Sequence, residues 1–351
     1  MKNPSRIPLN AALCLLTSVL CLLAHTARAW DYAAHRAINL AALSAMPADF
    51  PAFLKTPAAR ERISYLAGEP DRWRNSYSPS LRHINQIEHF FDMEELDPLG
   101  MKFADLSQFR YTFIQQLTLA QARHPEVAPK IPPDKDKDAT APFPGFLPWA
   151  IAENYGKLQS GFSTLRAFEQ HGGTPVEIAN ARENVAYIMG RMGHYVADSV
   201  QPLHITKHYN GWVGDNPRRY TTSRGFHAWI DNGFLAKTGP LDTDALTQRM
   251  KPAQRLSYSA EDPANRDPIF VHIIEHMQRQ LPKVEQLYAL DKAGKLDAES
   301  PGAKEGRAFL EDQLLTGAQF LAALWYTACK TAPDDTYLIK QLETRKAAAA
   351  Q

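Results

Sequence analysis

The chain has 351 residues, of which 44% are hydrophobic, with 39 basic and 38 acidic side chains. This near balance excludes a protein that is drawn to nucleic acid or to an anionic membrane by net charge alone. The length suits one large domain or two small ones.

The first 29 residues have the layout of a secretory signal peptide. Lys2 and Arg6 precede an apolar run over residues 11–24, and a small-x-small sequence, Ala-Arg-Ala, ends at Ala29. We therefore expect cleavage after Ala29 and a secreted or periplasmic protein. The apolar run is short for a membrane span, and no later run is long enough for one.

Cleavage at this position changes the charge and the cysteine content. The leader holds three basic residues and no acids, so 36 basic and 38 acidic side chains remain. Cys14 and Cys21 leave with the leader, and Cys329 is then the only cysteine. An intramolecular disulfide is impossible in such a chain, so stability has to come from the core or from bound metal.

Most of the remaining chain is predicted to be helical, and we expect one all-α domain over residues 30–340. Apolar residues recur at spacings of three and four in six segments: 33–45, 106–122, 147–168, 182–200, 270–281 and 308–327. Loops are expected at 127–148, which is rich in Pro and charge, and at 210–223. The Ala-rich end, residues 341–351, is expected to fray.

Two His-x-x-x-Asp pairs are the first candidates for metal ligands. His194 and Asp198 share one face of a predicted helix, so both side chains can reach one ion. His204 follows after a Gln-Pro break, and His227 with Asp231 repeats the spacing. Imidazole nitrogens with carboxylate oxygens suit zinc, and a carboxylate can bridge two ions.

Further candidates precede these pairs. Asp71 lies in Glu-Pro-Asp-Arg-Trp-Arg, and His89 lies in Glu-His-Phe-Phe-Asp. After cleavage, the free α-amino group and the carbonyl of Trp30 can chelate a metal together. His35, just over one helical turn later, would supply a third ligand. The pattern as a whole indicates a secreted multi-metal hydrolase.

Each piece alone has an ordinary structural explanation. One His-x-x-x-Asp pair is usually capped or solvent-facing, and Asp71 with Arg74 is usually a surface salt bridge. The joint occurrence in one chain is what favours a metal site. Among the remaining histidines, His272 and His276 suit an amphipathic core helix, and His208 is a candidate substrate contact near the site loop.

Together these motifs resemble the zinc-dependent phospholipase C and single-strand nuclease superfamily. The resemblance spans Trp30 to about Leu235, whereas residues 96–150 and 240–351 match by helical character only. It implies an all-helical fold with three zinc ions in a cleft. The three implied ligand sets are Asp71, His89, His194 and Asp198; then His204, His227 and Asp231; and then the amino and carbonyl groups of Trp30 with His35 and Asp198, which would bridge two ions.

The resemblance also implies hydrolysis of a phosphodiester by zinc-activated water. Asp71 is the candidate to orient or deprotonate that water, and Arg74 is the candidate to hold a phosphate oxygen. In the nuclease branch, Phe90 and Asp92 would hold a nucleobase, with the aromatic ring stacked on the base.

Two branches of the superfamily remain open. The close spacing of Trp30 and His35, the Asp-x-x-Arg at Asp71 and the final ligand Asp231 favour a nuclease acting on single-stranded DNA or RNA. The Gly-Phe before His227 is closer to the phospholipase C branch, which acts on phosphatidylcholine-like lipids. A helical binding protein with a structural zinc cluster is a third interpretation, and no protein partner is implied.

Overall fold

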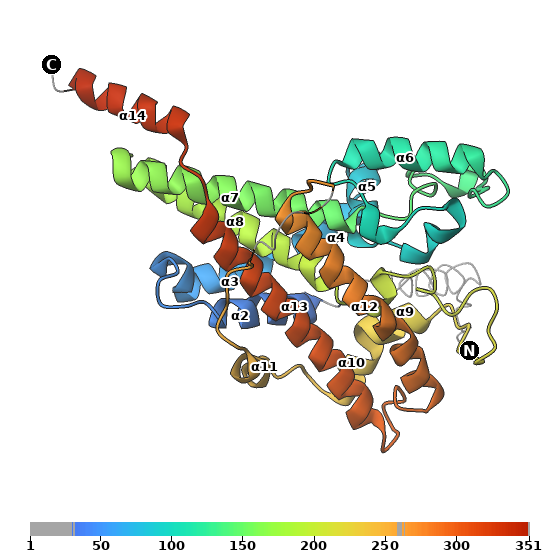
Figure 1. The fold of residues 1–351 in the computed structure, drawn as a ribbon. Coiled ribbons are helices and arrows are strands. Elements are labelled where there is room, and N and C mark those ends of the chain that lie inside the picture. Colours follow the sequence, from blue (N-terminus) through green and yellow to red (C-terminus); the bar gives the residue numbers. More distant parts are fainter. Residues whose placement is uncertain (1–29, 31, 258–261, 263, 350–351) are drawn as a thin grey trace, which may run out of the picture.

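A computed structural model describes residue 30 and residues 32–257, 262 and 264–349. Within these residues the chain is mostly helical, and β-type pairing is limited to an isolated bridge between Phe91 and Gly145. Figure 1 traces the helices along the chain. The predicted all-α class is therefore confirmed. The expected signal peptide, residues 1–29, lies outside the described residues.

The connections between the helices range from short turns to long loops that contain 3-10 turns. Their bounds are α2 (Tyr32–Ser44), α3 (Pro57–Leu66), α4 (Glu69–Arg74), α5 (Pro79–Gln86), α6 (Arg110–Arg123), α7 (Leu147–His171), α8 (Pro175–Asp198), α9 (Phe226–Ala228), the π-helix η9 (Trp229–Gly233), α10 (Phe234–Thr238), α11 (Thr243–Arg249), α12 (Pro268–Lys292), α13 (Ala303–Thr331) and α14 (Thr336–Ala349). Single 3-10 turns are η2 (Ala52–Lys55), η3 (Ile87–His89), η4 (Met93–Glu95), η5 (Asp97–Leu99), η6 (Phe103–Asp105), η7 (Pro133–Lys135) and η8 (Pro202–His204).

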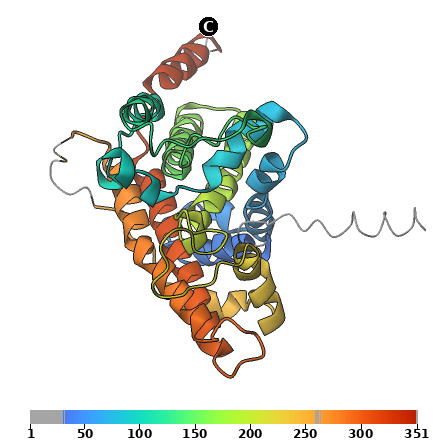
Figure 2. The same ribbon diagram turned by 90° about the vertical axis from the view of Figure 1, so that its right-hand side faces the viewer.

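The six periodic segments correspond to α2, α6, α7, α8, α12 and α13. Helix α12 runs beyond the predicted end at residue 281 and continues through Pro282, because buried Val284, Leu287 and Tyr288 extend its core face. Residues 341–349 belong to α14, and Ala and Lys are strong helix formers. Figures 1 and 2 show α14 at the edge of the fold, where Arg345 pairs with Glu177 at the start of α8.

Helices α2, α3 and α8 meet at unusually short range. Gly193 on α8 lies so close to α2 that an added Cβ would stand 1.7 Å from Oδ1 of Asn39. The Asn39 amide donates to the Ile63 carbonyl of α3 at 2.9 Å. This approach brings the ring of His35 onto the ring of His194, with 3.9 Å between the centroids. Helix packing thus delivers two of the predicted ligands to one place.

We expect Gly193→Ala to destabilise the protein by about 1–3 kcal/mol, since the methyl group would displace the hydrogen-bonded Asn39 amide. Urea unfolding measures the change. Gly156→Ala on exposed α7 is the matched control, because a Cβ there meets nothing within 4 Å. The control should be neutral or more stable, since Ala favours helix over Gly. Equal stabilities for both variants would contradict the close packing of α2 and α8.

Candidate metal centre

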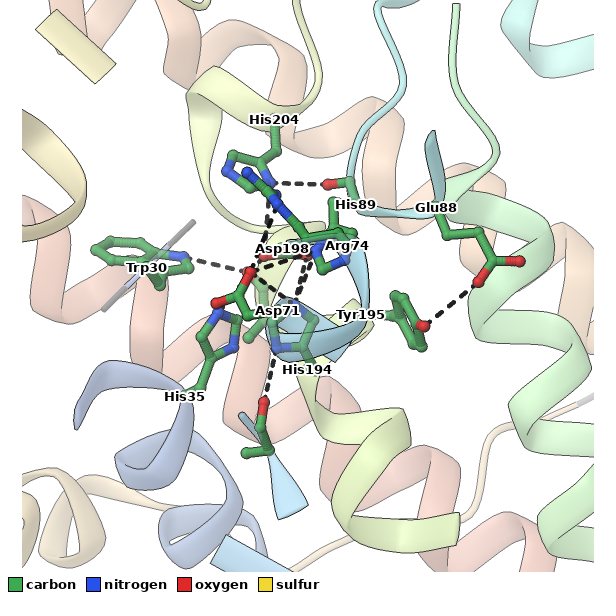
Figure 3. A network of polar contacts seen from close by, with 12 residues as sticks. Trp30, His35, Asp71, Arg74, Glu88, His89, His194, Tyr195, Asp198 and His204 are labelled. Atoms are coloured by element: carbon green, nitrogen blue, oxygen red, sulfur yellow. Dashed lines mark hydrogen bonds and ion pairs between the residues drawn. The ribbon is translucent and has the colours of Figure 1, made fainter. Parts of the chain in front are cut away.

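Four predicted ligands from three separate elements converge on one point. Asp71 comes from α4, His89 from η3, and His194 with Asp198 from the last turns of α8. Figure 3 shows their side chains pointing toward one another. His89, His194 and Asp198 are fully buried, whereas Asp71 is only partly shielded from solvent. The tertiary fold therefore assembles this set as the sequence predicted.

The ligand atoms of this cluster have spacings that suit a small cation. Nδ1 of His89 lies 2.9 Å from Nε2 of His194 and 3.0 Å from Oδ2 of Asp198. Nε2 of His194 lies 3.2 Å from the same oxygen. Oδ1 of Asp71 is 3.9 Å and 4.0 Å from the two histidine nitrogens. Ligands of a tetrahedral zinc ion are about 3.3 Å apart, so small adjustments would complete the shell.

In two of the histidines, a hydrogen bond at Nδ1 determines that Nε2 is the nitrogen that can bind a metal. Nδ1 of His194 lies 2.7 Å from the Ala67 carbonyl, and Nδ1 of His204 lies 2.7 Å from the His89 carbonyl. A carbonyl oxygen can only accept, so each Nδ1 carries the hydrogen and each Nε2 keeps its lone pair. Backbone carbonyls commonly orient metal-binding histidines in this way.

His204, His227 and Asp231 form a second cluster. Nε2 of His227 lies 3.0 Å from Oδ2 of Asp231, and the rings of His204 and His227 are 5.0 Å apart. Asp231 lies in the π-helix η9, a rare conformation that is frequent at functional sites. Oδ1 of Asp198 lies 3.4 Å from Nδ1 of His204, so the two clusters are close neighbours.

The third predicted set is assembled in part. Nε2 of His35 lies 3.7 Å from Oδ1 of Asp198, and its ring also groups with Asp71 and His194. The indole of Trp30 is buried, and its N–H donates to the carbonyl of Ala197 at 3.2 Å. The side chains of Trp30 and His35 therefore both lie beside the first cluster, as Figure 3 shows.

Several ligand atoms are buried without a hydrogen bond among the described residues. They include Nε2 of His204, Oδ1 of Asp71 and Asp198, and Oδ2 of Asp231. Each such atom costs about 1–3 kcal/mol when nothing compensates it. A bound cation would compensate several of them at once. The donor set and the unsatisfied atoms thus fit a metal.

Burial dominates the electrostatics of the two clusters. It lowers the pKa of His89 and of His204 well below the usual range, so both imidazoles are neutral. It raises the pKa of Asp198 to about 6. Burial also opposes a charge on His194, but Asp198 and Asp71 outweigh it and raise the pKa of that residue. Neutral imidazoles beside costly buried carboxylates are the arrangement that a divalent cation stabilises.

A cleft of about 580 Å³ opens onto the second cluster. His204 and His227 line it together with Arg74, Phe90 and Asp92. The fold therefore brings the predicted phosphate-binding and base-binding residues to the same cleft as two of the candidate ligands. Arg74 also lies 3.7 Å, Nε to Oδ1, from Asp71.

The backbone around Phe90 is fixed by a close contact with Gly145. A Cβ on Gly145 would stand 2.0 Å from the Phe90 carbonyl oxygen, and the φ of Gly145 is 129°. Only glycine fits both conditions. Burial, together with nearby Glu94 and Glu95, raises the pKa of Asp92 well above its usual range. The Asp92 carboxyl group lines the cleft and can accept hydrogen bonds.

Two other histidine predictions have clear outcomes. His208 is not among the residues that line the cleft; it stacks on Trp212 at 3.9 Å and its Nδ1 accepts from the backbone N–H of Val213. It therefore has a packing role, and the predicted substrate contact is not supported. His276 stacks on Phe320 inside the helical core, as expected.

Sequence reasoning missed several groups around the centre. Gln201 is fully buried and its amide donates to Oδ1 of Asp231, while its own carbonyl accepts from the backbone N–H of Leu203 at 2.7 Å. Its place three residues before His204 was the available signal. Tyr209, at the cleft wall, carried no signal because nothing in its neighbourhood marks it as a contact.

Comparisons with family models, curated proteins and solved structures find no match to this chain. Among the described residues, no helix is both long and apolar enough to cross a membrane. The case for a function therefore rests on the chemistry and geometry of the two His/Asp clusters.

We expect Asp198→Asn to lose metal at more than one position, because Asp198 belongs to the first cluster and also lies 3.7 Å from His35, a candidate ligand of the third set. Elemental analysis after gel filtration measures the metal content per chain. Asp334→Asn, at an exposed carboxylate, is the control and should keep the full content. An Asp198→Asn protein that is folded and keeps its full metal content would show that this carboxylate is not a shared ligand.

Proposed function

We propose that the protein is a secreted zinc-dependent phosphodiesterase that cleaves single-stranded DNA or RNA. The observation that carries the proposal is the pair of neighbouring His/Asp clusters, the second of which lines an open cleft through His204 and His227. A purely structural metal site would be closed to water, whereas here His204 and His227 line the cleft. The open access favours a catalytic role over a binding or scaffold role.

Zinc is the metal that the donor set fits best. The ligands are imidazole nitrogens and carboxylate oxygens, at spacings close to those of a tetrahedral shell. Calcium and magnesium prefer shells built from oxygen alone. We therefore expect zinc at each cluster, with a third ion near His35 after the N-terminus is processed.

The side chains have distinct tasks in this proposal. Bound zinc would supply water that ionises near neutral pH and would offset the charge of the phosphate. Asp71 has one buried oxygen without a hydrogen bond, so it can accept a hydrogen bond from an attacking water and orient it. The Arg74 guanidinium lines the cleft and can hold a phosphate oxygen.

The cleft walls support a nucleobase as the group beside the phosphate. Phe90 and half-exposed Tyr209 offer aromatic faces, and the Asp92 carboxyl can accept hydrogen bonds from donor atoms on the edge of a base. Stacking of this kind is tolerant of base identity. A single-stranded substrate follows, because its bases can leave the stack and enter the cleft.

A phospholipase C is the second candidate, and one observation favours it. Large apolar side chains are exposed around a hollow of about 740 Å³ on the other side of α5. Phe109 is 64% exposed, Tyr111 is 80% exposed and Ile84 is 55% exposed. Such side chains could contact a lipid surface. Parallel assays of the purified protein on single-stranded DNA and on phosphatidylcholine vesicles separate the two candidates.

Phe90→Ala should weaken oligonucleotide binding by about 1–3 kcal/mol, the value of one stacked base. Hydrolysis of bis(p-nitrophenyl) phosphate, which has no base, should change much less because the clusters are intact. Tyr111→Ala is the control, since that ring lines the other hollow. Equal losses on both substrates would instead mean that Phe90 supports the metal ligands.

Processing of the N-terminus should be required for full activity if the Trp30 α-amino group binds zinc. A protein that begins at Trp30 should bind three zinc ions, whereas one with a single Met before Trp30 should bind one fewer and react slowly. The added residue converts the amine into an amide, which has no available lone pair. Zinc analysis and turnover of the two forms provide the measurement. Identical values would remove Trp30 from the site.

A further inference from the structure

We infer that Glu88 is a positioning residue that sets the distance between His89 and His194 from behind the first cluster. The inference rests on the proposed metal centre and adds a residue that touches neither metal nor substrate. Glu88 is buried, with 8% of its surface exposed, on the far side of the chain from the ligand atoms.

The Glu88 carboxylate joins two elements that carry ligands. One oxygen, Oε2, accepts a hydrogen bond from the Tyr195 hydroxyl at 3.3 Å. Glu88 immediately precedes His89 in η3, and Tyr195 immediately follows His194 in α8. Figure 3 shows Tyr195 and Glu88 extending away from the cluster while the two histidines face it. One hydrogen bond therefore ties the two segments together on the side opposite the metal ligands.

Further contacts make this tie stiff. The Tyr195 ring lies 5.7 Å from the His89 ring and 5.6 Å from the His194 ring, centroid to centroid. The other carboxylate oxygen, Oε1 of Glu88, accepts from Nη2 of Arg110 at 2.8 Å. The Tyr195 hydroxyl is buried, and burial together with Glu88 raises its pKa, so it remains a donor. These contacts leave η3 little freedom to move relative to α8.

The tie matters because the ligand spacing is short. His89 Nδ1 and His194 Nε2 lie 2.9 Å apart, so both nitrogens can reach one ion only while η3 stays close to α8. If η3 moved away from α8, one ion could no longer be reached by both nitrogens. Loss of such an outer partner commonly lowers metal affinity by about 10–100-fold.

Cobalt(II) titration of the metal-depleted full chain tests the inference, because its visible absorption reports both affinity and geometry. We expect Glu88→Gln and Tyr195→Phe each to weaken cobalt binding at the first cluster by about 10–100-fold and to alter the spectrum. The double variant should bind little worse than Tyr195→Phe alone, since Tyr195→Phe removes the hydrogen bond that Glu88→Gln only weakens by removing the negative charge.

Glu153→Gln is the matched control. Glu153 also pairs with Arg110, at 3.0 Å from Nε, but it is exposed and belongs to α7, which carries no ligand. This variant should bind cobalt as the unmodified protein does. Thermal unfolding of the metal-free forms identifies a variant that has lost its fold. If Glu88→Gln does not fold, the inference is tested with Tyr195→Phe, which is the milder change.

The outcomes are distinguishable. Wild-type affinity and spectrum in a folded Glu88→Gln or Tyr195→Phe protein would overturn the inference and leave the proposed function intact. An equal loss in Glu153→Gln would also overturn it, because the effect would then come from Arg110 alone. An unmodified protein that binds no cobalt would overturn the proposed function and the inference together.

Discussion

The fully buried carboxylate of Asp198 is the group on which the centre depends. A carboxylate without access to water is costly unless cations or donors surround it. Here its two oxygens lie within 3.7 Å of nitrogens from His35, His89, His194 and His204. These nitrogens come from four separate segments of the chain. The helical fold can therefore be understood as the frame that brings these segments to one carboxylate.

The frame achieves this through close backbone approaches. Where α2 crosses α8, Gly193 leaves room for the Asn39 amide, and His35 can then stack on His194. Gly145 lies directly against the backbone of Phe90. This backbone follows the candidate ligand His89 and leads into the cleft wall. Packing density, ligand position and cleft shape are thus set by the same few contacts, so changes far from the metal can alter the chemistry.

The features that could be predicted from the sequence are those that depend on the spacing of residues within one element. Helix periodicity located the long helices, and the spacing of four placed His194 beside Asp198 within one helix. Local spacing could not predict the long-range contacts, because the partners of Glu88 and Gln201 lie in other elements of the chain. For the same reason the packing role of His208 was not visible, since it depends on a contact with the ring of Trp212.

X-ray diffraction at the zinc absorption edge, from crystals of the protein that begins at Trp30, tests the central claim most directly. The account predicts one anomalous peak among Asp71, His89, His194 and Asp198, a second at the cluster of His204, and a third beside His35. An ordered protein without an anomalous peak at either His/Asp cluster, after growth with zinc present, would contradict it.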